Sequence, residues 1–355
     1  EAIALGGAFL GTGGGGDPYI GKLMAKQVIA RHGPVRVIPA DDLADDALCI
    51  PVCMMGAPTV MVEKLPNGEE AREALGQLET FLGRKADALI CIEAGGLNST
   101  IPFAVAAATG LPLVDGDGMG RAFPELQMVT LTIHGISATP MVLADDKGNS
   151  SVINAISNKW TERLARCQTV EMGGAALVAL YPMSGAEVKR GILRGSMSLI
   201  REIGQTMAAE RKASRNPADA LVRRLDGKRL FTGRVVDIDR RTVGGFARGK
   251  AEFKGMDDDE GRTFTVEFQN EFLIFSRDGE MEVCVPDLVV VLELDTGLPI
   301  TTEMLRYGQR VAVLALPCHR LLRTSEALDV IGPAAFGHPD ITYRPMVEEM
   351  EHEPA

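Results

Sequence analysis

The stretch ALICIEAGGLNSTIPFAVAAATGLPLVDGDG, residues 88–118, decides the fold class. It opens on a fully apolar run, Ala88–Ile92, which is typical of a buried strand. A short helix is expected next, with Pro102 in its first turn and Gly110 as its C-cap, before a second apolar run at Leu111–Val114. A strand, a helix and a strand within about 30 residues form a βαβ unit, so the sequence predicts a parallel or mixed sheet.

Helical and extended patterns alternate on both sides of this unit. The residues from Gly68 to Gly83 repeat apolar side chains at helical spacing, and Leu48 to Met54 is an apolar strand. The run Val129 to His134 alternates between apolar and polar side chains, which favours a strand. Asn154 to Arg166 is expected to be a helix, and Gly185 to about Arg211 a longer one.

The residue pattern changes after Asp226, where short apolar runs are separated by turn residues. We therefore predict an α/β N-terminal domain, with a mixed or parallel sheet and helices, followed by a β-rich C-terminal domain. The predicted bounds are 1–168 for the N-terminal domain and 169–345 for the C-terminal domain, which is helical at 185–211 and β-rich at 226–316; 346–355 is expected to be a flexible tail.

Composition and charge exclude several classes of protein. The chain of 355 residues has 37 Lys and Arg against 48 Asp and Glu, giving a net charge of −11, and only 5% of its residues are aromatic. A nucleic-acid binder needs a basic surface and stacking side chains, so no nucleic-acid partner is expected. No apolar stretch is long enough to span a bilayer, so no membrane partner is expected either. Six cysteines without a Cys-x-x-Cys pair are typical of a cytoplasmic protein.

The glycine-rich loop Gly11–Gly16 precedes a helix that Asp17 is expected to cap. A dinucleotide-binding fingerprint needs a strand before such a loop, and a helix-like segment stands there instead. A ligand can still approach the backbone of Gly13, Gly14 and Gly15 closely, and a helix N-terminus favours anions. We therefore expect these glycines and Asp17 to bind a small-molecule substrate, with a tight turn between helices as the alternative.

Acidic residues follow both strands of the βαβ unit. Glu93 comes after the first strand, and Asp115 and Asp117 come after the second. Ligands of open α/β sheets bind beyond the carboxyl ends of the strands, so the three acids are expected to converge as catalytic residues. The alternative for Asp115 and Asp117 is a polar turn in which their side chains cap backbone N–H groups.

Three further residues complete the predicted site. His134 is one of five histidines and is expected to act as a proton shuttle or ligand, with a structural role as the alternative. Arg121 is expected to pair with a substrate carboxylate, or else with a nearby acid. Asn98, in the loop after Glu93, is expected to bind substrate. The acids leave a divalent metal open, but the residues give no certain cofactor.

Several motifs together resemble a known family. They are Gly11–Tyr19 (GTGGGGDPY), Met55–Val60 (MGAPTV), Glu93–Asn98 (EAGGLN), Asp115–Glu125 (DGDGMGRAFPE), Pro286–Leu288 (PDL), Thr302–Gly308 (TEMLRYG) and Gly332–Gly337 (GPAAFG). In this order and over nearly the whole chain, the sequence resembles the bacterial family named after S-methyl thiohydantoin desulfurase.

The resemblance implies an α/β N-terminal domain, a β-containing C-terminal domain and hydrolysis of a carbon–sulfur bond on a five-membered cyclic ureide. Members are often encoded near hydantoinase- or oxoprolinase-type proteins. The expectation is therefore a hydrolase that releases methanethiol from an S-methyl thiohydantoin. The alternative is a non-catalytic ligand-binding subunit that partners a hydantoinase-like enzyme. A homo-oligomer also remains open.

Overall fold

The computed structural model describes residues 1–57, 60 and 68–346. Its helices are α1 (Ala2–Leu10), α2 (Pro18–His32), α3 (Glu70–Leu82), α4 (Ile101–Thr109), α5 (Thr130–Ile133), α6 (Asn158–Glu171), α7 (Gly185–Gly191), α8 (Ser196–Lys212), α9 (Ala218–Arg224) and α10 (Ser325–Ile331). The predicted tail at 346–355 lies outside the described residues, apart from Met346.

The βαβ unit is present, and it sits inside a mixed sheet. The strands of this first sheet are β1 (Val37–Ile38), β2 (Leu48–Gly56), β3 (Ala88–Ile90), β4 (Leu113–Val114), β6 (Met141–Ala144), β7 (Ser150–Ile153), β8 (Ala175–Ala179) and β9 (Met183–Ser184). Among the described residues their order is β1-β4-β3-β2-β8-β6-β7, with β9 paired to β2. Strands β1 to β4 pair in parallel, whereas β8, β6, β7 and β9 join antiparallel.

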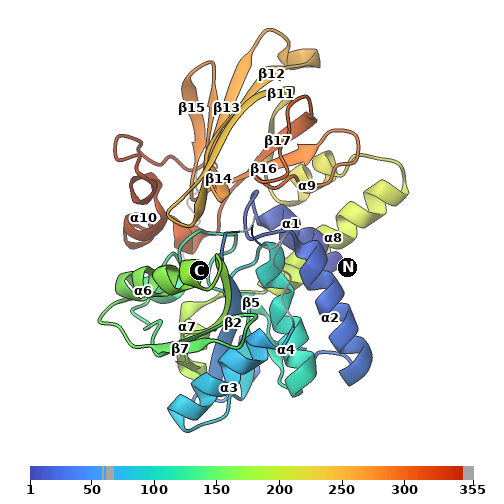
Figure 1. Cartoon of the computed structure of the whole chain (residues 1–355). Helices are drawn as coiled ribbons and strands as arrows, with labels where there is room; N and C mark the ends of the chain where they lie inside the picture. The colour runs from blue at the N-terminus through green and yellow to red at the C-terminus, as the bar shows by residue number, and fades with distance from the viewer. Residues whose placement is uncertain (58–59, 61–67, 347–355) are drawn as a thin grey trace, which may run out of the picture.

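The second sheet is antiparallel and curls above the first in Figure 1. Its strands are β11 (Lys228–Val243), β12 (Phe246–Gly255), β13 (Thr263–Gln269), β14 (Glu271–Arg277), β15 (Glu280–Cys284), β16 (Leu288–Glu293) and β17 (Arg310–Leu316). Phenylalanines from β11, β13 and β14 stack in its interior, and Phe253 of β12 packs edge to face against them. Both parts of the predicted fold class, a mixed α/β sheet with helices and a β-rich C-terminal region, are confirmed. The predicted boundary at residue 168 stays a prediction.

Local signals set two helix ends as predicted, the start of α2 and the end of α4. The Asp17 carboxylate accepts a hydrogen bond from the Tyr19 backbone N–H at 2.8 Å, and Pro18 begins α2. Gly110 ends α4 in the left-handed conformation, with φ 76°. These positions need a cap, a fixed φ or a missing side chain, which is why the sequence alone predicts them.

Two predicted elements are wrong. Val129 to His134 is not a strand, because Thr130–Ile133 winds into the short helix α5 after Gly118 O accepts a hydrogen bond from Thr130 N. The helix predicted at 185–211 is broken in two: Leu193–Arg194 forms strand β10, which pairs with β5 (Gly116–Asp117). Gly195, with φ 77°, turns the chain between β10 and α8.

The glycine loop joins the two sheets. Phe272 N, at the start of β14, donates to Thr12 O at 2.7 Å, and Thr302 N donates to Gly13 O at 2.8 Å. Gly13 has φ 88°, and a Cβ there would lie 2.4 Å from the Phe272 ring. A side chain at this position would therefore prevent the second sheet from reaching the loop.

Candidate active site

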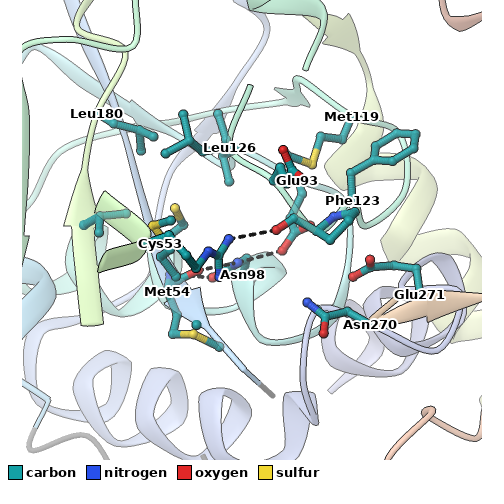
Figure 2. A pocket seen from close by; sticks show the side chains of 18 of the residues that line it. Cys53, Met54, Glu93, Asn98, Met119, Phe123, Leu126, Leu180, Asn270 and Glu271 are labelled. Carbon is teal, nitrogen blue, oxygen red and sulfur yellow. Dashed lines mark hydrogen bonds between the residues drawn. The ribbon is translucent and has the colours of Figure 1, made fainter. Parts of the chain in front are cut away.

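A pocket lies where the first sheet, the glycine loop and β14 meet; its cavity volume is about 60 Å³, and it is partly open to solvent. Figure 2 shows Glu93 and Asn98 on one side of this pocket and Glu271 with Asn270 on another. Its apolar wall carries sulfur and branched side chains: Cys53, Met54, Met55, Met119, Met141, Leu126, Val178 and Leu180. The pocket is thus largely apolar, with few polar groups converging on it, as expected of a small-molecule site.

Glu93 is held at the pocket wall by donors from the chain itself. Asn98 Nδ2 donates to Glu93 Oε1 at 2.6 Å, and the Phe123 backbone N–H is a second donor. Burial nevertheless raises the pKa of Glu93 to about 8, since removing water penalises the charged form more than these donors favour it. A carboxyl whose pKa is raised in this way is suited to proton transfer near neutral pH.

Asn98 has both ends of its amide fixed. Its Oδ1 accepts a hydrogen bond from Met54 N at 2.7 Å, and its Nδ2 donates to Met54 O at 3.0 Å as well as to Glu93. The backbone of β2 thus decides which way the amide points, and the amide in turn orients the Glu93 carboxyl. The structure brings the predicted Asn98 and Glu93 together.

Glu271 is a second buried carboxyl in the same pocket, at the first position of β14. Burial, and then the nearby Glu93 carboxyl, raise the pKa of Glu271 well above its usual value, although Arg121 acts in the opposite direction. Its Oε2 accepts no hydrogen bond from any described residue. A buried carboxyl that has an oxygen without a hydrogen-bond partner, a raised pKa and a second carboxyl nearby is a strong candidate for acid–base chemistry.

The glycine loop comes close to Glu271. A Cβ on Gly14 would lie 2.0 Å from Glu271 Oε1, and Gly15, with φ 72°, lines the pocket and favours the ionised Glu271 through its backbone N–H. Of the three glycines predicted to bind substrate, Gly15 lines the pocket, Gly14 lies against Glu271, and Gly13 lies against Phe272 outside the pocket lining. That they bind substrate stays a prediction. Asp17 lies in a different groove, between α1, α2 and the second sheet.

Asp115 and Asp117 turn away from the pocket. Asp115 caps the first turn of α8, where its Oδ1 accepts from Met197 N at 2.9 Å and from Ser198 N at 3.0 Å. Asp117 is fully buried, and its carboxylate accepts hydrogen bonds from the backbone N–H groups of Ala94, Met119 and Gly120 and from the Ser196 hydroxyl. Burial raises the pKa of Asp117 to about 6, while these donors lower it. Both carboxylates occupy the capping role weighed as the alternative.

His134 and Arg121 also lie outside the pocket lining. His134 is exposed at the end of α5. Arg121 is fully buried and donates to Thr12 Oγ1 at 2.8 Å, Phe272 O at 3.0 Å and Asp287 O at 2.8 Å. The Arg121 guanidinium thus connects the N-terminal part to the second sheet. Its N–H groups already donate to these acceptors, so they are not available to bind a substrate carboxylate.

One feature of the sequence points to Glu271, which is not among the site residues predicted from the sequence. Gln269, Asn270 and Glu271 are three consecutive polar residues between phenylalanine-rich strands, and all three are buried. Asn270 has φ 58°, so the two strands turn at this point and Glu271 is presented to the pocket. Buried polar residues at a tight turn usually need partners that lie elsewhere in the chain.

A metal site needs several His, Cys, Asp or Glu side chains close together. Within residues 1–57, 60 and 68–346, no three His, Cys, Asp or Glu side chains gather as a set of metal ligands. Across the same residues, no helix is both long and apolar enough to cross a membrane.

Comparison with known proteins adds two findings. Residues 1–155 match the model for the S-Me-THD-like N-terminal domain, and residues 156–346 match the model for the S-Me-THD-like C-terminal domain. A crystal structure of a protein from Chromobacterium violaceum superposes with a TM-score of 0.76 at 27% identity, covering 98% of each chain. No curated protein matches closely enough to count as a relative.

Proposed function

Because the chain belongs to the S-Me-THD-like family, we propose that it hydrolyses the carbon–sulfur bond of an S-methyl thiohydantoin and releases methanethiol. The observation that carries this proposal is the pair of buried carboxyls, Glu93 and Glu271, that line one pocket and have raised pKa values. Of the residues predicted as catalytic, the mechanism uses Glu93 alone and adds Glu271.

Glu93 acts as the general base. It has donors for its charged form, from Asn98 and from the Phe123 backbone, and so it is the carboxyl better suited to hold a negative charge. With a pKa of about 8 it is also a stronger base than an ordinary carboxylate. It takes a proton from the attacking water.

Glu271 acts as the general acid. Burial and the nearby Glu93 carboxyl raise its pKa well above the usual value, so Glu271 holds a proton more readily than an ordinary carboxyl and can donate it. When their environments give two carboxyls different pKa values, one can act as the acid and the other as the base. Because the two interact, their titration belongs to the pair.

The reaction balances with these two groups and one water. The water oxygen bonds to the ring carbon that carries sulfur, as Glu93 takes a water proton and Glu271 protonates the ring nitrogen. The tetrahedral adduct then forms its C=O bond and returns the hydroxyl proton to Glu271. The C–S bond breaks, and the proton on Glu93 leaves with sulfur as methanethiol. The products are a hydantoin and methanethiol, and both carboxyls regain their starting states.

The apolar wall suits the leaving group. Met119 and Met141 are polarizable thioethers, and Leu126 and Leu180 lie beside them on the wall. A methylthio group packs well against such side chains, whereas the carbonyl oxygen of the product has no donor there. All six cysteines are unpaired, in keeping with a cytoplasmic location for this activity.

The test is incubation of the purified chain with a synthetic S-methyl thiohydantoin in ¹⁸O-labelled water. The expected result is catalytic release of methanethiol, seen with a thiol reagent, and one ¹⁸O atom in the hydantoin. Tight binding of the ring without turnover would contradict the enzyme and support the alternative, a ligand-binding subunit. Neither binding nor turnover would place the substrate outside this class.

A further inference from the structure

Helix α6 has its polarity reversed relative to an ordinary surface helix. The side chains that face the protein are Thr161, Glu162, Ala165 and Thr169, of which only alanine is apolar. The large apolar side chains point outward: Trp160 is 45% exposed and Leu164 is 41% exposed. A surface helix normally buries its apolar stripe against the core, so this arrangement needs a separate explanation.

The inner face is polar because it supports the pocket. Glu162 accepts a hydrogen bond from Leu126 N at 3.0 Å and pairs with Arg166 at 2.7 Å. Arg166 in turn donates to Pro124 O at 2.9 Å and lines the pocket itself. The polar residues of the inner face therefore stabilise a wall of the pocket, and the large apolar side chains of α6 lie on its outer face.

The exposed side chains form a continuous line along the helix. Trp160, Leu164 and Cys167 follow one another at helical spacing, and Ile156 lies just before the helix; we call these four residues the outer stripe. Ile156 is 91% exposed, and Trp160 is the only tryptophan of the chain. The Arg163 guanidinium lies 5.3 Å from the centre of the Trp160 ring. Exposed apolar stripes mark interaction surfaces, and Trp and Arg are enriched where such surfaces bind most strongly.

We propose that the outer stripe is the seam of a homodimer, in which α6 packs antiparallel to α6 of a second copy. Figure 1 shows α6 at one side of the molecule. The partner is identified by charge. Lys159 and Arg163 lie in the first turns of α6, Glu171 ends the helix, and all three are exposed.

This order of charges opposes the helix macrodipole, which favours anions at the start of a helix and cations at its end. None of these three side chains forms an ion pair with another described residue. A two-fold axis midway between Leu164 and Cys167 places Glu171 of one copy opposite Trp160 of the other, next to Lys159 and within one helical turn of Arg163, twice over. The surface is thus complementary to itself, as an isologous interface requires.

The experiment is sedimentation velocity and light scattering on the full chain. The wild type is expected to be a dimer, and Leu164→Glu is expected to raise the dimer dissociation constant by at least about tenfold, because it buries a charge in the seam. The matched control is Tyr307→Glu, which places the same charge at a tyrosine that is 79% exposed on the far part of the chain and is expected to leave the dimer intact. Unchanged circular dichroism shows that each variant is folded.

A charge exchange tests the antiparallel arrangement. The double variant Lys159→Glu with Arg163→Glu is expected to weaken the dimer, and adding Glu171→Lys in the same chain is expected to restore it. A wild type that stays monomeric at every concentration overturns the proposal. So does a dimer that Leu164→Glu leaves unchanged, or a charge exchange without rescue. The outcome is independent of whether the chain turns over a thiohydantoin.

Discussion

At the scale of single residues, the role of each buried carboxyl depends on the hydrogen-bond donors that surround it. Asp117 accepts hydrogen bonds from three backbone N–H groups and a hydroxyl, so its charge is used inside the fold. Glu271 has an oxygen without a partner among the described residues, and Glu93 has two donors. The Asp117 carboxyl therefore serves the structure, whereas those of Glu93 and Glu271 are the ones we propose for chemistry, and the difference is set by the donors around each carboxyl.

Replacing Asn98 with Asp tests the control of Glu93. The change keeps the shape but removes the Nδ2 donor and places a like charge beside Glu93, so the pKa of Glu93 rises further. Because the base must be ionised, the acidic limb of the profile of kcat/KM against pH is expected near pH 8 in the wild type. That limb is expected to move to higher pH by about one unit in N98D. Asn154→Asp, an exposed control with the same added charge, should leave the limb in place; equal profiles for N98D and the wild type would refute the role of Asn98.

Replacing Asp115 with Ala separates capping from catalysis. The variant loses the cap of α8, which is expected to lower the free energy of unfolding by about 0.5–2 kcal/mol. Turnover by the folded protein should stay near that of the wild type, because Asp115 does not line the pocket. Urea unfolding and initial rates check both parts. A large loss of kcat in a variant of unchanged stability would return Asp115 to the catalytic residues.

At the scale of elements, the sequence predicted what is local and missed what is long-range. The βαβ unit, the caps at Asp17 and Gly110 and the β-rich region after Asp226 follow from patterns within a few residues. Glu93 and Asn98 were predicted because they lie in the segment that follows a buried strand. Glu271 lies far from them in the chain, and only the contact between β14 and the glycine loop brings it to the same pocket.

Alternation alone proved a weak guide where the run was short. Thr130–Ile133 forms a single turn of helix, although its polar and apolar residues alternate. A run of this length fits either period, and the hydrogen bond from Thr130 N to Gly118 O decides for the turn. Similarly, the broken helix at Gly191–Gly195 was not predicted, because the pairing of β10 with β5 is a tertiary contact.

Gly14→Ala tests the contact between the glycine loop and the acid. Gly14 does not need a left-handed backbone, but its new Cβ would lie 2.0 Å from Glu271 Oε1 and would push the carboxyl aside. We expect kcat to fall by at least about tenfold with little loss of stability, since the displaced group is the end of a flexible side chain. Gly13→Ala is the matched comparison: it combines φ 88° with a clash at the Phe272 ring, so it should mainly lower stability. A fully active G14A would contradict the proposed place of Glu271.

At the scale of the whole molecule, the pocket exists only because two sheets are held together. Glu93 and Asn98 come from the first sheet and its loops, and Glu271 comes from the second. Arg121 and the glycine loop make the hydrogen bonds that join them. Anything that loosens this junction should therefore separate the two carboxyls before it unfolds either sheet.

Arg121→Met measures the strength of the junction. The fully buried guanidinium serves Thr12, Phe272 O and Asp287 O, which methionine leaves unpaired. We expect the free energy of unfolding to fall by about 3–5 kcal/mol, as for one partner removed from a buried polar network. Arg248→Met, at an exposed arginine of β12, is the control and should change it little. Denaturant unfolding followed by the fluorescence of Trp160 gives both values, and equal effects of the two changes would contradict the account of Arg121.

The most direct measurement of the central claim is the rate of methanethiol release by Glu271→Gln, beside Glu93→Gln and Glu303→Gln. Glutamine keeps the shape of each side chain but has no acidic proton to give and no carboxylate to take one. Glu303 is also a buried glutamate with a raised pKa, yet it does not line the pocket. The account predicts that E271Q and E93Q each lose at least about 10²-fold in kcat while E303Q stays near the wild type. A folded E271Q that releases methanethiol at the rate of the wild type would contradict it.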